Sequence, residues 1–212
     1  MLWWPQRETL VVSDLHLGKV GHFRKAGIAL PQKALSATLG RLDRALAYWN
    51  PSRLLVLGDM FHSDYNRELE AFATWRERWQ ALDMALVPGN HDVLPAGLYT
   101  EWKIDVLPVR YREAGICFVH DPAHAVGDEA HIAGHVHPGV RLRGGGRQSL
   151  RLPCFWFGQN RALLPACGAF TGSVALRPKA GERVFAWTGK GVVDVSPEAK
   201  NGSAESGTAN QL

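Results

Sequence analysis

Short apolar runs recur along the chain, and each ends at a cluster of polar residues. The runs are residues 9–12, 53–57, 84–87, 116–119 and 131–133. Apolar runs this short, bounded by turn-forming residues, are typical of buried β-strands. The sequence therefore predicts a series of strands with polar side chains at their carboxyl ends.

Two stretches between the first three runs have helical spacing instead. A helix is expected from Pro31, which suits a first helical position, to the stop at Asn50-Pro51. Its buried stripe would consist of Leu35, Leu39, Leu42 and Leu46. A second helix is expected from Asn66 to Leu82, with a buried face formed by Leu69, Phe72, Trp79 and Leu82. Two successive strand-helix-strand units predict a parallel sheet with right-handed crossovers.

From Val109 onward the pattern changes to short alternating runs separated by glycine. The expected strands are residues 109–112, 116–119, 131–133, 140–143, 149–152, 155–157, 184–187 and 192–195. The segments 144–146 and 188–191 are typical of hairpin turns. We therefore expect a mainly antiparallel second sheet packed on the first, within an α/β fold.

The composition is that of one ordinary domain. The 212 residues, 46% of them hydrophobic, suffice for a sizeable core without disulfides. The domain should span residues 1–195, because residues 196–212 have little to bury and should form a disordered tail. The three cysteines lack CxxC spacing, which predicts buried thiols in a reducing compartment. Neither a secretory signal nor an apolar run of about 20 residues is visible, so we expect a cytoplasmic protein without a membrane partner.

The polar clusters share one kind of chemistry. In layered α/β folds, ligands and catalytic groups gather at the carboxyl ends of the strands, so these strand ends can share one site. They contribute two carboxylates, one carboxamide and five imidazoles: Asp14, Asp59, Asn90, His16, His91, His120, His135 and His137. This is a ligand set for two divalent metals with one histidine left over. Each motif alone is typical of a turn or a hydrogen-bonded loop, but all of them in this order favour a metal site.

The succession of Asp-x-His, Gly-Asp, Gly-Asn-His-Asp, a lone His and Gly-His-x-His over residues 9–195 resembles the calcineurin-like metallophosphoesterases. The resemblance implies a four-layer αββα sandwich, with two mixed β-sheets flanked by helices. It implies one metal on Asp14, His16, Asp59 and His137. It implies a second metal on Asp59, Asn90, His120 and His135, so that Asp59 bridges the two ions.

Two divalent ions can share a bridging hydroxide and clamp the phosphoryl oxygens during an in-line displacement, when they lie about 3.5 to 4 Å apart. Two aspartates and the hydroxide would leave one net positive charge, which favours a phosphodiester monoanion over a dianionic monoester. His91 is the histidine left for protonating the leaving oxygen, and Asp92 beside it can orient the imidazole. Mixed oxygen and nitrogen ligands fit Mn²⁺ best, with Fe or Zn as alternatives.

One position departs from the family pattern. His62 stands where a second aspartate is usual, and Asp64 follows only later. Asp64 can cap the next helix. His62 can contact substrate, although an exposed or capping histidine is the favoured interpretation.

Four further segments resemble a narrower bacterial group, the ligase-associated DNA damage response endonucleases. These segments are residues 14–19, 23–24, 58–63 and 164–172. This resemblance implies DNA as the substrate and a role in DNA repair. It also implies a DNA ligase, a helicase and a nuclease as partners.

Positive charge is concentrated in one stretch, although the net charge is only +4. Residues 131–180 contain no Asp or Glu, and their basic residues are Arg141, Arg143, Arg147, Arg151, Arg161, Arg177 and Lys179. The first four are candidates for contacts with backbone phosphates, as are Lys19 and Arg24 in the glycine-rich loop after the first strand. The alternative is a solvated basic hairpin over an aromatic core.

Three functions compete on this basis. The first, which we expect, is a metal-dependent phosphodiesterase or endonuclease that acts on DNA. The second is a phosphohydrolase for a small molecule, such as a nucleotide or a lipid-linked diphosphate. The third is a non-catalytic scaffold, which would have lost ligands, whereas all seven ligand positions and His91 are present.

Overall fold

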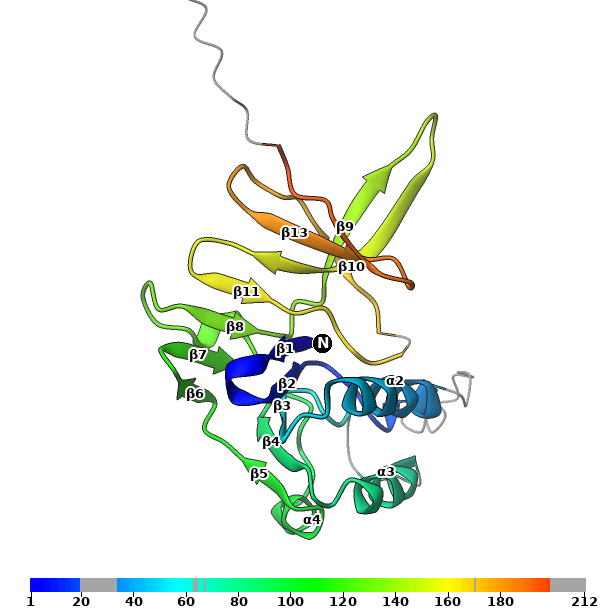
Figure 1. Cartoon of the computed structure of the whole chain (residues 1–212), viewed down its shortest axis with the longest axis vertical. Helices are drawn as coiled ribbons and strands as arrows, with labels where there is room; N and C mark the ends of the chain where they lie inside the picture. Colours follow the sequence, from blue (N-terminus) through cyan, green and yellow to red (C-terminus); the bar gives the residue numbers. More distant parts are fainter. Residues whose placement is uncertain (20–33, 63–64, 67, 170, 199–212) are drawn as a thin grey trace, which may run out of the picture.

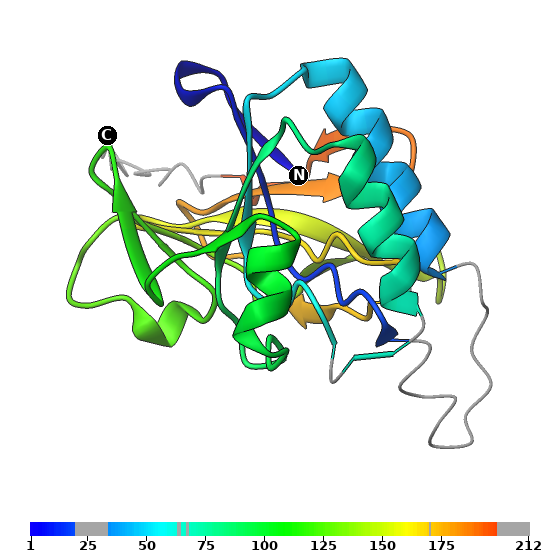
Figure 2. The same ribbon diagram turned by 90° about the horizontal axis from the view of Figure 1, so that it is seen from below.

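A computed structural model describes residues 1–19, 34–62, 65–66, 68–169 and 171–198 of the chain. Two β-sheets pack face to face, and the α-helices lie on the outer side of the first sheet (Figure 1, Figure 2). The predicted fold class, an α/β fold with two mixed sheets, is confirmed.

The first sheet has five strands in the order β1-β2-β3-β4-β5. Its centre is formed by β2 (Thr9–Val12), β3 (Arg53–Leu57) and β4 (Asp83–Val87), which run parallel to one another. The connections contain α2 (Ala34–Trp49) and α3 (Glu68–Arg78), which confirms the two strand-helix-strand units. The expected start of the first helix at residue 31 lies outside the described residues.

Four elements of this half were not predicted. β1 (Leu2–Trp4) pairs antiparallel with β2 and leads into the one-turn helix η1 (Pro5–Arg7). The short helix α4 (Ala96–Glu101) precedes β5 (Ile104–Val106), which extends the sheet parallel to β4. These elements complete the two edges of the first sheet.

The second helix is shorter than expected, because α3 ends at Arg78 and not at Leu82. The side chain of Arg76, which is 5% exposed, accounts for this end. Its guanidinium donates hydrogen bonds to the carbonyl oxygens of Leu82 at 3.1 Å and of Trp102 at 2.8 Å, and also to that of Trp79. The Trp79 and Leu82 carbonyl groups, which lie beyond the end of α3, therefore accept from a side chain, and the Trp102 bond ties this segment to the end of α4.

The second sheet has nine strands and contains both antiparallel and parallel pairs. Along the path β12-β9-β10-β11-β8-β7-β6, the bounds are Val174–Leu176, Pro138–Arg143, Ser149–Phe157, Arg161–Leu163, His131–Ala133, Ile116–Val119 and Arg110–Glu113. β13 (Arg183–Trp187) pairs with β10 and with β14 (Val192–Asp194). Both predicted hairpin turns are confirmed, whereas residues 149–157 form one strand where two were expected.

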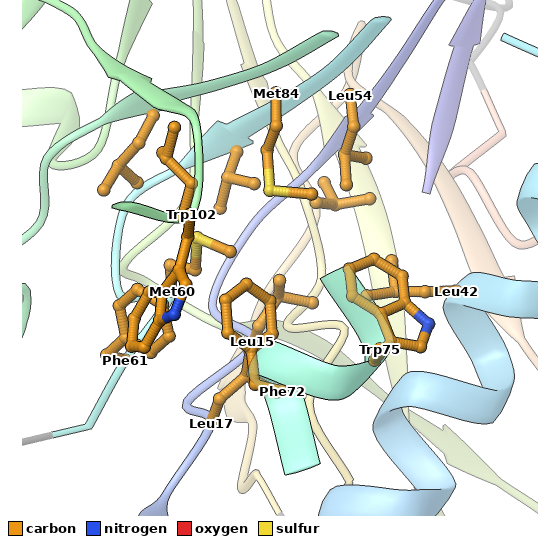
Figure 3. Close-up of a cluster of buried hydrophobic side chains, with 14 of the residues drawn as sticks. Leu15, Leu17, Leu42, Leu54, Met60, Phe61, Phe72, Trp75, Met84 and Trp102 are labelled. Carbon is orange, nitrogen blue, oxygen red and sulfur yellow. The ribbon is translucent and has the colours of Figure 1, made fainter. Parts of the chain in front are cut away.

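The largest apolar cluster lies between the first sheet and the helices (Figure 3). It contains the predicted stripe of α2, with Leu42 and Leu46 each 1% exposed, together with Phe72 and Trp75 of α3. The two remaining clusters lie on opposite faces of the second sheet, and one of them fills the space between the sheets.

The outer face of the second sheet differs from the implied four-layer arrangement. The three α-helices of the described residues all pack on the first sheet. The outer face of the second sheet instead buries Cys154, Trp156 and Val184 in a cluster formed largely by the sheet's own strands. A short one-turn helix, η2 (Pro122–His124), contacts β8.

The end of the domain lies slightly later than expected. The Ser196 hydroxyl accepts a hydrogen bond from the backbone N–H of Val184 at 2.9 Å, so this residue belongs to the folded domain. Residues 199–212 of the predicted tail lie outside the described residues. The three cysteines are buried and unpaired, as predicted. None of the helices in the described part of the chain has the length and apolar content needed to cross a bilayer.

Candidate metal centre

The polar clusters of both sheets converge at one place. Asp14 follows β2 of the first sheet, whereas His135 follows β8 of the second. The backbone N–H of His135 donates to both carboxylate oxygens of Asp14, at 3.2 and 3.1 Å. Strand ends from the two sheets therefore form one site, as expected for a layered α/β fold.

Alternating side chains anchor the site to the core. Leu15 and Leu17 are 1% and 2% exposed and pack in the cluster under the first sheet (Figure 3), whereas Asp14 and His16 face the site. The backbone N–H of His16 donates to the carbonyl oxygen of Asp59 at 2.8 Å, which joins the segments after β2 and β3. The buried leucines thus fix the height and direction of the polar side chains between them.

Six of the predicted ligands form two groups. The groups are Asp14, His16 and His137, and Asp59, His120 and His135, with the ligand atoms of each group within 4.8 Å of one another. Asp59 faces both groups, because its Oδ2 lies 3.7 Å from Nε2 of His16 and its Oδ1 lies 3.4 Å from Nε2 of His120. A carboxylate with one oxygen toward each group has the position that a bridging ligand requires.

Asn90 belongs to the second group. Its side-chain Oδ1 lies 3.3 Å from Nε2 of His120. The other ring nitrogen of His120, Nδ1, lies 3.0 Å from the carbonyl oxygen of Leu57 and can donate to it. Such a bond fixes the tautomer and turns the Nε2 lone pair toward the centre, as in most metal-ligating histidines.

The backbone is strained at most of the ligand positions. Left-handed φ values occur at Asp14 (53°), His16 (47°), Asp59 (49°), His135 (62°) and His137 (49°). Non-glycine residues adopt this conformation rarely, and it clusters at functional sites.

Two motif glycines are explained by close approach. A Cβ on Gly89 would lie 2.4 Å from the backbone nitrogen and from Oδ1 of Asp59. A Cβ on Gly134 would lie 2.7 Å from Oδ2 of Asp14. The glycine before each ligand segment therefore lets one ligand loop pack directly against an aspartate of another.

The electrostatics put two key ligands in their metal-binding protonation states. Burial lowers the pKa of His16 to about 3, so its imidazole is neutral at pH 7. Burial alone would raise the pKa of Asp59, but the hydrogen bond and charge of His120, the backbone N–H of His91 and the charge of His16 together lower it to about 2. Burial opposes a charge on His120 as well, yet Asp59 and the Leu57 carbonyl raise its pKa to about 9. A metal ion must displace that proton when it binds.

The donor atoms fit divalent ions. Among the described residues, the buried Nε2 atoms of His16 and His137 have no hydrogen-bond partner. Nε2 of His137 lies 3.1 Å from Oδ1 of Asp14 without hydrogen-bonding geometry. Buried nitrogen atoms are rarely left without a partner, and an ion coordinated by imidazole, carboxylate and carboxamide groups would supply it.

Comparison with known proteins decides the family. The model of the calcineurin-like phosphoesterases matches residues 8–156. The chain belongs to the calcineurin-like phosphoesterase family. It is therefore a metal-dependent phosphoesterase, and the resemblance inferred from its motifs is confirmed.

A solved structure agrees with this assignment. The calcineurin-like phosphoesterase is 34% identical to the Pseudomonas putida nuclease MPE, with a TM-score of 0.77 over 91% of this chain and 90% of that chain. It is also similar to Yfce, a phosphoesterase from E. coli, at 15% identity and a TM-score of 0.46, over 89% of this chain and 98% of that chain. No curated protein matches the sequence.

His91 lies beside the two ligand groups of the phosphoesterase and belongs to neither. Its backbone N–H donates to Oδ1 of Asp59 at 3.0 Å, and its ring meets that of His16 edge-on at 5.4 Å. The role of His91 as proton donor stays a prediction.

Asp92 makes contacts other than the expected ones. Its Oδ1 accepts from the backbone N–H of Phe61 at 3.0 Å, and its Oδ2 accepts from that of Gly89 at 2.8 Å. No hydrogen bond joins it to the His91 ring among the described residues. Burial raises the pKa of Asp92 to about 6 despite these two bonds. The Asp92 carboxylate thus joins the loops after β3 and β4. It does not bond the His91 ring, because the side chains of these neighbouring residues point in different directions.

His62 lies in the site and is not exposed, and its contact with substrate stays a prediction. The residue is half-buried, its ring stacks on that of His91 at 4.8 Å, and its Nδ1 lies 3.2 Å from Nδ1 of His16. Three segments meet at this ring, which no local pattern reveals.

The candidate substrate contacts are more scattered. Lys19 lies close enough to the site for Asp59 to influence it, although burial lowers its pKa. Arg24 and Asp64 lie outside the described residues. Arg141, Arg143 and Arg151 are exposed on β9 and β10, and Arg147 lies in the turn between these strands.

Two supporting positions were missed by the sequence analysis. Oδ2 of Asp121 lies 3.8 Å from Nε2 of His135, and the Asp-Pro pair after His120 is the only local signal for it. The backbone N–H groups of Cys167 and Gly168 donate to the carbonyl oxygens of Ser13 and Asp14, each at 3.0 Å. The segment 164–172, noted for its resemblance alone, thus supports the strand end that carries Asp14.

Proposed function

We propose that this phosphoesterase is a nuclease that hydrolyses phosphodiester bonds of DNA with two divalent metal ions. The observation that carries the proposal is the Asp59 carboxylate, which has one oxygen toward each ligand group. Two divalent ions, when bound, would neutralise phosphoryl charge and activate water for attack on phosphorus. Mn²⁺ suits the mixed oxygen and nitrogen donors best.

The protein's own residues would supply the remaining steps. Water releases one proton to the solvent and its oxygen bonds to phosphorus, the bond from phosphorus to the leaving sugar oxygen breaks, and a proton held on His91 passes to the leaving oxygen. The ring of His62 stacks at 4.8 Å and 19° on that of His91, which limits the directions that His91 can take. The backbone bond from His91 to Asp59 keeps the donor beside the ligand groups.

Support for DNA as the substrate comes from two sides. The neighbour with 34% identity is named a nuclease, and the exposed arginines of β9 and β10 follow directly after the ligand His137. The proposed role in DNA repair, with a ligase, a helicase and a nuclease as partners, has its support in the narrower sequence resemblance.

A substrate panel tests the proposal. The protein reconstituted with Mn²⁺ is incubated with single-stranded DNA, duplex DNA, an aryl phosphodiester and a set of nucleotides. We expect cleavage of DNA and of the aryl diester. Asp59→Asn should abolish both, whereas Asp105→Asn, an equal charge change at an exposed position of β5, should leave both intact. Hydrolysis of nucleotides with DNA left uncut would replace the proposal by the small-molecule alternative.

A further inference from the structure

The sheet formed by β12, β9 and β10 has two chemically different faces. Val140, Leu152 and Cys154 point to the apolar cluster on the outer face of the second sheet. Side chains alternate along a strand, so Arg141 and Arg151 lie on the opposite face. Phe155, farther along that same face of β10, packs on the cluster between the two sheets. The arginines therefore extend the inner face of the second sheet, on a hairpin that projects beyond the first sheet (Figure 1).

The positive charges on this face are concentrated and uncompensated. Arg141 and Arg151 are directly opposite each other in the antiparallel register, and Arg143 is opposite Ser149. Like charges in opposing positions destabilise a sheet. In the part of the chain that the structure describes, none of these three arginines has an ion pair. The register of β12 with β9, in which Leu176 lies beside Val140, brings Arg177 next to Arg141.

An exposed aromatic ring stands on the same face. Ala186 of β13 lies beside Cys154 of β10, and Trp187 is the next and last residue of β13. Ala186 is buried in the outer cluster, so Trp187 points to the arginine face, where it is 42% exposed. An open ring beside unpaired arginines is the combination that proteins use to stack a base while they bind the backbone.

The face begins at the metal centre. His137, a predicted ligand, is followed directly by β9. At the rise of an extended strand, Arg141 lies about 13 Å along the chain from His137 and Arg143 lies about 20 Å from it. A ligand that reaches both the metal centre and these arginines must be longer than one nucleotide.

We propose that Arg141, Arg143, Arg151 and Trp187 form a nucleic-acid-binding surface that leads a single strand to the metal centre. The arginines bind consecutive backbone phosphates, and Trp187 stacks on an unpaired base. This inference rests on the proposed nuclease function and adds to it the form of the substrate and its path.

Binding without cleavage tests the surface. Affinity for a fluorescent single-stranded oligonucleotide is measured in EDTA over a series of salt concentrations. Arg141→Gln/Arg151→Gln should lower the slope of log affinity against log salt by about 1.4, and the affinity at 0.1 M salt by roughly 25-fold. The matched control Arg44→Gln/Lys103→Gln removes the same charge from exposed positions of α2 and of the residue before β5, and should change neither. Circular dichroism melting verifies that both variants fold.

Replacing Trp187 should change the affinity in a different way from replacing the arginines. Trp187→Ala should weaken single-strand binding about 5- to 150-fold while the salt slope stays unchanged, because stacking releases no counterions. Duplex DNA, whose bases are already stacked, should not respond to Trp187→Ala. An unchanged affinity in Trp187→Ala would overturn the stacking contact.

Hydrolysis assays distinguish a failure of the proposed surface from a failure of the proposed nuclease function. In one outcome, wild-type protein with Mn²⁺ cuts DNA and the aryl diester, but the Arg141/Arg151 variant keeps the wild-type salt slope. In a second outcome with the same cleavage, the control variant loses as much affinity as the Arg141/Arg151 variant. Either outcome would contradict the proposed surface and leave the nuclease function intact. If wild-type protein binds DNA with the expected slope but hydrolyses neither substrate, the nuclease function is wrong and the surface stands.

Discussion

Gly89→Ala should disable the site through one misplaced methyl group. The new Cβ would lie 2.4 Å from the backbone nitrogen of Asp59, about 1 Å short of the 3.4 Å at which ordinary contacts begin. This nitrogen belongs to the backbone after β3, so it cannot swing away as the end of a flexible side chain would. The loops carrying Asp59 and Asn90 must therefore move apart by much of that distance.

The expected size of the effect follows from this displacement. Overpacking of a tight site costs about 1 to 3 kcal/mol of unfolding free energy. A displacement of about 1 Å in a catalytic constellation lowers the rate on the order of 100-fold. We therefore expect a modest loss of stability in Gly89→Ala, together with a large loss of kcat/KM.

A matched control isolates the cause. A Cβ on Gly97, in α4, would meet nothing within 4 Å, and its φ is not positive. Gly97→Ala should be neutral or stabilise the protein by about 0.5 to 1 kcal/mol, with full activity. Urea unfolding and hydrolysis of an aryl phosphodiester are measured for both variants. A Gly89→Ala variant within threefold of the wild-type kcat/KM would refute the steric argument.

Three further predictions concern single residues. Asp59→Ala should lose activity and at least one metal, because the two carboxylate oxygens of Asp59 face different ligand groups, and elemental analysis showing two retained ions would contradict this. His91→Ala should retain both metals and lose about 10²- to 10⁴-fold in rate on an alkyl diester. An aryl diester needs no proton donor and should react almost normally; equal loss on both esters would refute the role. Contacts with the Val126 N–H, Arg110 and Arg112 lower the pKa of Glu129 from 4.5 to about 2, so the stability that it contributes is present above pH 4.5 and disappears as the pH falls toward 2. Calorimetry of Glu129→Gln should therefore show a Tm deficit at pH 6 that vanishes near pH 2, and a constant deficit would contradict the assignment.

The central strands and the ligand residues were predictable because their signals are local. β2 is buried throughout, β3 and β4 are buried from their second residue, and the three strands end two or three residues before Asp14, Asp59 and the Asn90-His91 pair. A turn does not require a histidine flanked by an amide and a carboxylate, so the Asn90-His91-Asp92 motif indicates a metal site and not only a turn. The layered architecture then requires that the strand ends meet.

The edge elements could not be predicted, because long-range pairing defines them. β1 is three residues long and acquires its strand conformation by pairing with β2. Residues 149–152 and 155–157 were expected to form two strands, yet β10 continues through Pro153 between them. Proline removes one donor from the ladder, and the eight other residues of β10 retain their pairing capacity with β9, β11 and β13.

The conformation of the ligand residues is a property of the packed core. A left-handed backbone costs a non-glycine residue about 1 to 2 kcal/mol, so the five strained ligands cost about 5 to 10 kcal/mol together. That sum is similar to the whole stability of an ordinary domain, about 5 to 15 kcal/mol. The ligand segments therefore cannot hold this shape alone. It is imposed by the paired strands that precede them and by leucines such as Leu15 and Leu17, which are buried in the core on either side of His16. The local sequence therefore predicts which residues are ligands, whereas their strained backbone geometry forms only when both sheets have packed.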